Sequence, residues 1–171
     1  MGYEIHAVMS GDTHSARHYI GTFAADTLPR YAPRPSLIVM NNLASHTAGE
    51  HWLAATIDAQ GRGEFFDSYG RPPLVKNHRE FMNRNCTRWD YNETCLQSIG
   101  SDVCGQYCVM YLLHRAHGIN LSDYVQSYFS NDTIKNDEIV SAMFERYTVK
   151  NPLCETLSLS CHNQKCYPRR K

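Results

Sequence analysis

The sequence predicts an α+β fold: one compact domain with a central mixed, mostly antiparallel sheet packed by helices. Short apolar, partly β-branched runs separated by turn residues fill the middle of the chain, and the apolar spacing then changes to that of helices. The length of 171 residues suits a single domain spanning 1–171, in which 151–171 is expected to be an irregular, cysteine-containing basic tail. With 17 basic and 17 acidic residues the formal net charge is zero, which excludes a highly basic nucleic-acid coat protein.

Four strands are expected in the first hundred residues. Three prolines in 29–35 exclude a helix or a central strand there. The turn 59–63 is expected to join two of the strands as a hairpin. The expected strands are 36–40, 51–58, 64–69 and 89–97.

Four helices are expected around and after these strands: 74–84, 103–117, 123–129 and the stretch after Asp132. The stretch 103–117 is apolar nearly all round, which predicts a buried central helix that stops at Gly118. Ser122 and Asp132 are the expected N-caps of the last two helices. In the last helix, one face is formed by Ile139, Val140, Met143, Phe144 and Tyr147.

The expected environment of the chain is intracellular. No apolar run approaches the roughly 18 to 20 residues of a membrane span, and residues 1–6 do not resemble a signal peptide. Seven cysteines without a secretory signal argue against a full disulfide framework, and the odd number leaves at least one thiol free. We expect a monomer.

One of these thiols has the setting of a nucleophile. Cys104 begins the expected buried helix, where unpaired N–H groups and the helix dipole stabilise a thiolate, and Gly105 leaves room for a substrate. His51 and Asp67 lie on two neighbouring strands, so an imidazole could take the thiol proton while a carboxylate fixes its tautomer. The amide of Gln97 could stabilise an oxyanion.

Each of these residues also has an ordinary interpretation. A cysteine in an apolar helix is usually a core residue, a histidine is more often a surface group, and an aspartate often forms a turn. The order His, Asp, Gln, Cys makes the set improbable by chance, and it differs from the papain order, in which the cysteine comes first. Cys108, one helical turn after Cys104, is expected in the core.

The chain resembles the adenovirus-type cysteine endopeptidases (adenain), of the clan that includes the SUMO-specific proteases. The matching motifs are Gly49-Glu50-His51-Trp52, Phe66-Asp67-Ser68-Tyr69-Gly70, Gln97 followed after six residues by Cys104-Gly105, and upstream the segment 18–23. The resemblance covers about residues 18–117. It implies a related fold.

The resemblance also implies a role for each site residue. Cys104 would be the nucleophile, His51 the general base and then acid, and Asp67 the orienting carboxylate, where the adenovirus enzyme has Glu. Gln97 and the backbone N–H of Cys104 would form the oxyanion hole. Trp52 would shield the imidazolium, with an ordinary place in the strand core as the alternative.

The same resemblance implies two activators, a short viral peptide and DNA. The peptide would form a disulfide with Cys86, eleven residues before Gln97, and the alternative is a plain free thiol. DNA would need a local basic patch, for which Lys165 and 169–171 are the candidates. No metal is expected in the catalytic set.

The tail holds four potential zinc ligands, Cys154, Cys161, His162 and Cys166, without the usual C-x2-C spacing. A zinc site and a disulfide are therefore alternatives to free thiols, which we favour.

The function that the resemblance implies is an endopeptidase that cleaves capsid or core precursors at small, Gly-containing sites during maturation, in the virion and the host nucleus. An isopeptidase for SUMO or another ubiquitin-like protein is the alternative within the clan. A non-catalytic DNA- or capsid-binding module is the alternative from another class.

Overall fold

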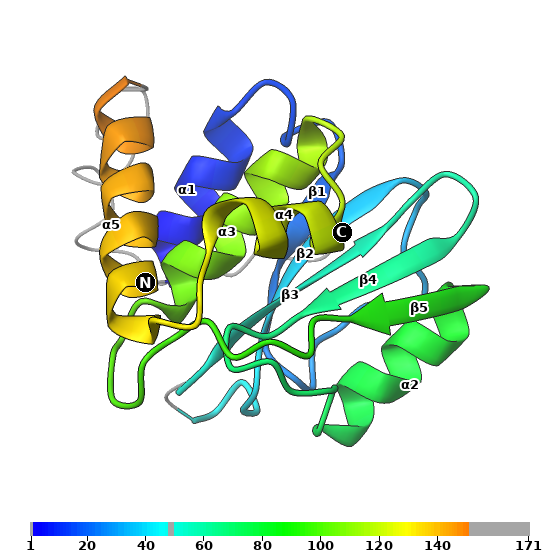
Figure 1. Cartoon of the computed structure of the whole chain (residues 1–171). Coiled ribbons are helices and arrows are strands. Elements are labelled where there is room, and N and C mark those ends of the chain that lie inside the picture. The colour runs from blue at the N-terminus through cyan, green and yellow to red at the C-terminus, as the bar shows by residue number, and fades with distance from the viewer. Residues whose placement is uncertain (1, 48–49, 151–171) are drawn as a thin grey trace.

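A computed structural model of the chain describes residues 2–47 and 50–150, which form a five-stranded sheet with helices on both faces (Figure 1). The elements in chain order are α1 (Gly2–Gly11), β1 (Tyr19–Phe23), β2 (Ser36–Asn41), β3 (Trp52–Ile57), β4 (Arg62–Phe66), α2 (Lys76–Asn85), β5 (Arg88–Tyr91), α3 (Cys104–Ala116), α4 (Leu121–Tyr128) and α5 (Thr133–Lys150). The expected α+β class is thereby confirmed.

The sheet is mixed, and its strands lie in the order in which they occur in the chain. The two outer pairs, β1–β2 and β4–β5, are parallel, whereas the central pairs β2–β3 and β3–β4 are antiparallel. The β3–β4 pair is the expected hairpin, and its turn contains Gly61 at a φ of 81°, a conformation that favours glycine.

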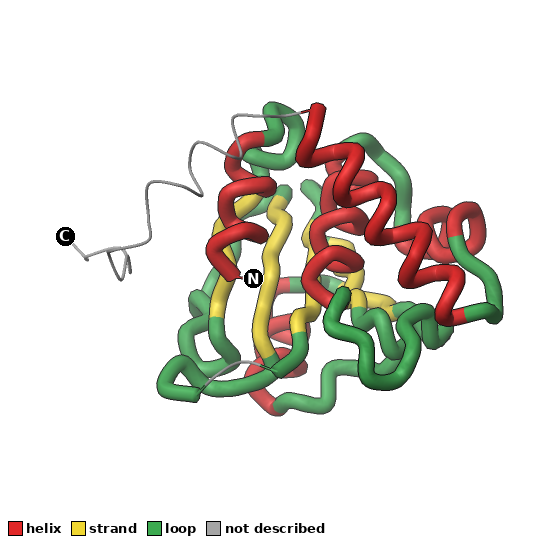
Figure 2. The backbone as a smooth tube through the Cα atoms, turned by 90° about the vertical axis from the view of Figure 1, so that its left-hand side faces the viewer, coloured by secondary structure: helices red, strands yellow, loops and turns green. Residues whose placement is uncertain are grey.

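Both faces of the sheet are covered, because alternate residues of the central strands point into different layers. Leu37 and Val39 of β2 pack into the cluster formed with α1, α3 and α4, whereas Ile38 and Met40 pack into the cluster that includes α2. Figure 2 faces the helical layer, in which helices lie in front of the yellow strands. Such double coverage explains why the strands read as continuous apolar runs.

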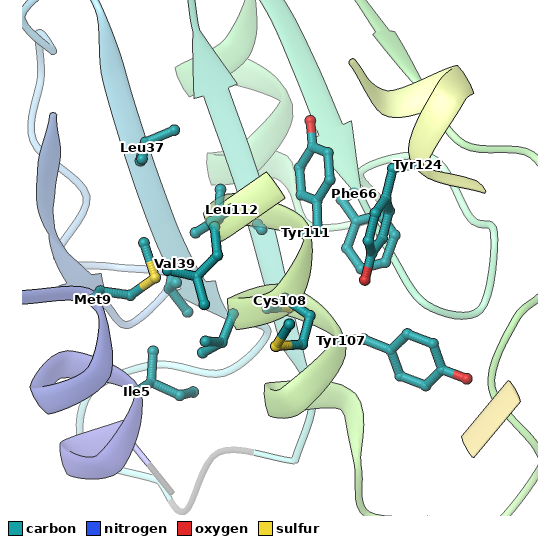
Figure 3. Close-up of a cluster of buried hydrophobic side chains, with 14 of the residues drawn as sticks. Ile5, Met9, Leu37, Val39, Phe66, Tyr107, Cys108, Tyr111, Leu112 and Tyr124 are labelled. Carbon is teal, nitrogen blue, oxygen red and sulfur yellow. The ribbon is translucent and has the colours of Figure 1, made fainter. Parts of the chain in front are cut away.

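Helix α3 is the central helix of this layer, as its apolar pattern predicts. Nine of its thirteen residues are buried, and it packs on β3. Its side chains occupy the middle of the cluster in Figure 3, with Cys108 fully buried as expected. The first residue of α3 is Cys104, so the thiol begins the buried helix as predicted.

Several expected boundaries are corrected by the structure. Strand β4 ends at Phe66 and not at 69, because Gly70 N–H bonds to Asp67 O at 2.7 Å and closes a turn. Strand β5 ends at Tyr91, so the expected strand 89–97 is wrong after that residue. The chain leaves the sheet there, and its later N–H groups at 96 and 97 bond to Ser68 O.

The caps of the last two helices have different outcomes. Asn120, and not Ser122, caps α4, since its side-chain oxygen accepts the N–H of Asp123 at 2.9 Å. Asp132 does cap the start of α5, where its carboxylate accepts the N–H of Lys135 at 3.1 Å. Helix α1 and strand β1 were not among the expected elements.

No helix within 2–47 and 50–150 has both the length and the apolar composition needed to cross a bilayer.

Candidate active site

The predicted triad lies at one end of the central strands, where the start of β3, the end of β4 and the start of α3 meet. His51 directly precedes β3, Asp67 directly follows β4, and Cys104 begins α3. Because β3 and β4 are antiparallel with Ala54 opposite Phe66, the start of one strand lies beside the end of the other. The histidine and the carboxylate are therefore brought together by the hairpin itself.

The imidazole of His51 lies between the carboxylate and the thiol. Its Nε2 is 2.7 Å from Asp67 Oδ1, and its ring is near enough to the Cys104 side chain for the two groups to shift each other's pKa. Since Asp67 occupies Nε2, Nδ1 is the ring nitrogen left for the thiol. The structure thus brings Cys104, His51 and Asp67 together in one site.

Asp67 is almost completely buried, with 4% of its surface exposed, and it is held at several points. Its Oδ1 also accepts the N–H of Tyr69 at 2.9 Å, and Arg71 Nε lies 3.4 Å from its Oδ2. The side chain of Asn92 bonds both the N–H and the C=O of Asp67, at 3.0 and 2.6 Å. These contacts fix the carboxylate before any substrate arrives.

The thiol and the imidazole shift each other's pKa toward an ion pair. Burial alone would lower the pKa of His51, but its hydrogen bonds to Asp67 and Cys104 raise the pKa to about 9. Burial alone would raise the pKa of Cys104, but hydrogen bonds from His51 and from the N–H groups of Trp52 and Gly105 lower it below its usual value. The arrangement can therefore hold a thiolate beside an imidazolium.

The aromatic ring beside His51 is Tyr69, which was not among the expected site residues. The two ring centroids are 4.9 Å apart with the planes tilted by 32°. The indole of Trp52 packs instead against Gly2 of α1 and the core around α3. This placement favours the strand-core interpretation of Trp52. The backbone N–H of His51 bonds to Asn42 Oδ1 at 3.0 Å, another contact that the sequence did not reveal.

Gln97 is fully buried, and all parts of its amide have partners. Its Oε1 accepts the Ser68 hydroxyl at 2.6 Å, which turns its Nε2 toward the opposite side. Nε2 lies 2.8 Å from Ser101 O and 2.9 Å from Ser101 Oγ. Because a carboxamide has only two N–H donors, one of these bonds must be exchanged before Gln97 can bind an oxyanion.

Cys86, the predicted attachment point for a peptide, is distant in the fold from these contacts. It follows α2 and is half-buried against Gly63 of β4, where a glycine is needed because a Cβ would lie only 2.4 Å from the Cys86 sulfur. Burial raises the pKa of its thiol to about 11. The structure also shows Cys95 as an exposed free thiol two residues before Gln97, and the sequence contains no pattern that marks this position.

One group of side chains outside the triad has the composition of a metal site. The ligand atoms of Asp12, His14 and His117 all lie within 4.8 Å of one another. Asp12 Oδ2 already accepts the N–H groups of His14 and Ser15, and the two imidazole rings have centroids 4.3 Å apart with their planes tilted by 40°. The tail residues considered for zinc or DNA, Cys154, Cys161, His162, Lys165, Cys166 and 169–171, lie outside the described residues.

Comparisons with known proteins add two structural similarities. No family model and no curated protein matches the chain. The chain is similar to the solved structure of ChlaDub1 from Chlamydia trachomatis, with a TM-score of 0.47, 16% identity, and coverage of 80% of this chain and 64% of that one. It is also similar to the ASFV pS273R protease, with a TM-score of 0.40, 21% identity, and coverage of 64% and 45%.

The chain spans less than two thirds of the length of either structure. Membership of the adenovirus-type family stays a prediction, and the function is inferred from the chain's own side chains.

Proposed function

We propose that this protein is a cysteine protease. Cys104 is the nucleophile, His51 the general base and acid, and Asp67 the carboxylate that orients the imidazole. The observation that carries the proposal is the position of His51, which is hydrogen-bonded to a buried carboxylate and interacts electrostatically with the thiol that begins a buried helix.

The reaction proceeds through a thioester. The Cys104 thiolate attacks the scissile carbonyl carbon, and the electron pair of the C=O bond moves to oxygen, where N–H donors stabilise it. His51 then donates its proton to the leaving amine as the C–N bond breaks. In the second half, His51 takes a proton from water, the resulting hydroxide attacks the thioester, and the acid product leaves with Cys104 as the thiolate.

The substrate class that we propose is a polypeptide precursor of a capsid or core, cut at Gly-containing sites in the virion or the host nucleus. The segment 18–23, which resembles an early element of the adenovirus-type family, supports this choice over an isopeptidase for ubiquitin-like proteins, although both reactions use the same triad. A non-catalytic binding module would not need the buried carboxylate, the imidazole and the thiol to be connected, so their connection argues against that alternative.

The test is a mass-spectrometric survey of cleavage in a peptide library, with parallel arms for a capsid-precursor peptide and a Gly-Gly-linked ubiquitin-like conjugate. Cys104→Ala and His51→Ala should each lower turnover at least about 10³-fold, whereas His46→Ala, which changes an exposed histidine elsewhere, should not. Equal turnover in the wild type and Cys104→Ala would contradict the proposal. Addition of DNA, a candidate peptide or a reductant to each arm tests the two activators.

A further inference from the structure

Helix α5 holds the segment that carries Gln97, although α5 lies beyond the stretch that contains the active-site motifs. The Asp137 carboxylate of α5 accepts both the hydroxyl and the backbone N–H of Ser98, the residue after Gln97; the N–H contact measures 3.3 Å. Asn136, the preceding residue of α5, donates its side-chain N–H to Leu96 O at 3.2 Å. Both neighbours of Gln97 in the chain are therefore hydrogen-bonded to the same turn of α5.

Tyr107 ties this arrangement to the helix of the nucleophile. It lies three residues after Cys104 on α3, and its ring extends from the edge of the core cluster (Figure 3). Its buried hydroxyl is 3.0 Å from Asp137 Oδ1 and 3.1 Å from Leu96 O. The distance between the Gln97 segment and the start of α3 is thus set by a network with Asp137 at its centre.

The side chain of Gln97 depends on this backbone position. Its N–H and its Oε1 are both bonded to Ser68, so the amide can rotate little about its own bonds. The remaining freedom of its Nε2 is movement together with the backbone at 96–98, which Asp137 restrains. A displacement of about 1 Å at a catalytic group can cost on the order of 10²-fold in rate.

We propose that Asp137 is a positioning residue for the active site, which sets the place of the Gln97 amide relative to Cys104 through its bonds to Ser98 and Tyr107. This inference rests on the proposed function, since it presumes that Gln97 stabilises an oxyanion. It adds α5 to the catalytic apparatus and goes beyond the residues that the motifs contain.

The test compares two reactions of the same thiol. Acylation of Cys104 by p-nitrophenyl acetate passes through an oxyanion, whereas its alkylation by iodoacetamide is a substitution at carbon and does not. The nitrophenolate release measured with the Cys104→Ala variant is subtracted as background. Alkylation is measured on the Cys104 peptide by mass spectrometry. The measured quantity is the ratio of the acylation rate to the alkylation rate.

Asp137→Asn should lower this ratio about tenfold, and Gln97→Ala should lower it further. The matched control is Glu138→Gln, which removes a charge from the next, exposed residue of α5 and should leave the ratio unchanged. Ser98→Ala, which keeps the carboxylate, is the second variant if Asp137→Asn does not fold, and it should lower the ratio in the same direction.

The possible failures can be told apart. The inference would be overturned if folded Asp137→Asn or Ser98→Ala had the same ratio of acylation to alkylation rate as Glu138→Gln. It would also be overturned if Gln97→Ala had the wild-type ratio. If Cys104 of the wild type reacts with neither reagent faster than Cys95 does, the proposed function itself fails. A defect that is merely structural would slow both reactions and leave their ratio unchanged.

Discussion

His51 controls the proposed chemistry because it is the one group that contacts both the acid and the nucleophile of the set. Its Nε2 faces a carboxylate that has 4% exposed surface, and its ring interacts with the Cys104 side chain. Each neighbour stabilises the protonated ring, which outweighs the opposing effect of burial. The resting pair is therefore expected to be a thiolate and an imidazolium over a range of pH that has two limits.

The lower limit is visible as the reactivity of the thiol. Because the pKa of Cys104 lies below its usual value, its alkylation by iodoacetamide should become fast at a lower pH than that of an ordinary thiol. Rates at each cysteine are measured by mass spectrometry from pH 5 to 10, with the exposed Cys95 as the internal reference. A Cys104 rate that rises only together with that of Cys95 would contradict the ion pair.

The upper limit is set by His51, whose pKa is raised to about 9. As pH rises through that value the imidazolium loses its proton, and the acid that protonates the leaving amine is lost. Asp67→Asn removes the charge that stabilises the imidazolium, so the alkaline limb of kcat/KM should move to lower pH. The variant should retain more activity than His51→Ala. Asp90→Asn, on exposed β5 surface, is the control and should leave the limb in place.

At the scale of elements, the loop 98–103 connects the predicted oxyanion donor to the nucleophile. Ser101 in this loop accepts both N–H bonds of the Gln97 amide, while Ile99 beside it is 99% exposed. The oxyanion of the tetrahedral intermediate and Ser101 therefore compete for the two N–H groups of the Gln97 amide. The loop therefore affects the rate as well as connecting two elements.

Ser101→Ala should raise kcat about two- to threefold with little change in KM, because one amide hydrogen is freed while the bond to the backbone carbonyl remains. Steady-state kinetics on the best peptide of the survey provide the measurement. Ser127→Ala removes an exposed hydroxyl from α4 and should have no effect. A fall in kcat would mean that the hydroxyl holds the amide in its working position.

A second prediction at this scale concerns the reactivity of the Cys86 thiol, at the end of helix α2. The thiol packs against Gly63 and its pKa is raised to about 11, so it should react with iodoacetamide at pH 8 much more slowly than Cys95. A disulfide with an activating peptide would require this thiol to leave its packed position. Cys86→Ser should keep basal activity, and it should abolish activation by a candidate peptide only if that peptide forms the disulfide.

The sequence predicts those parts of the site that depend on the pattern within a single helix or hairpin. The continuous apolar run after Cys104 predicts a buried helix, and the spacing of two hairpin strands predicts that His51 and Asp67 meet. The polar contacts between elements leave no such pattern: Asn92 bonds Asp67 from 25 residues away, and Asp137 bonds Ser98 from 39 residues away. Ordinary residues acquire these roles only when the chain has folded, as the early end of β5 also shows.

At the scale of the whole molecule, the sheet separates two apolar layers that have different tasks. The layer with α1, α3, α4 and α5 surrounds the helix that begins with Cys104, whereas the layer with α2 packs on the other face of the sheet. In the α2 layer His78 is fully buried, and its Nε2 lies 3.1 Å from Asn41 O. Changes in this layer should therefore affect the stability of the fold more than the chemistry of the site.

His78 gives this distinction a measurable form. Burial lowers its pKa from 6.5 to about 4, so between these pH values the unfolded chain binds a proton that the folded chain does not. The free energy of unfolding should thus fall as pH drops through this range, by about 1 to 2 kcal/mol between pH 6.5 and 5 from this group. In His78→Gln, whose amide can also donate to Asn41 O, urea unfolding should depend less on pH, whereas His46→Gln should behave as the wild type. Alkylation of Cys104 at pH 7 should be equal in all three proteins, and a pH dependence in His78→Gln as steep as in the wild type would assign the acid sensitivity to other groups.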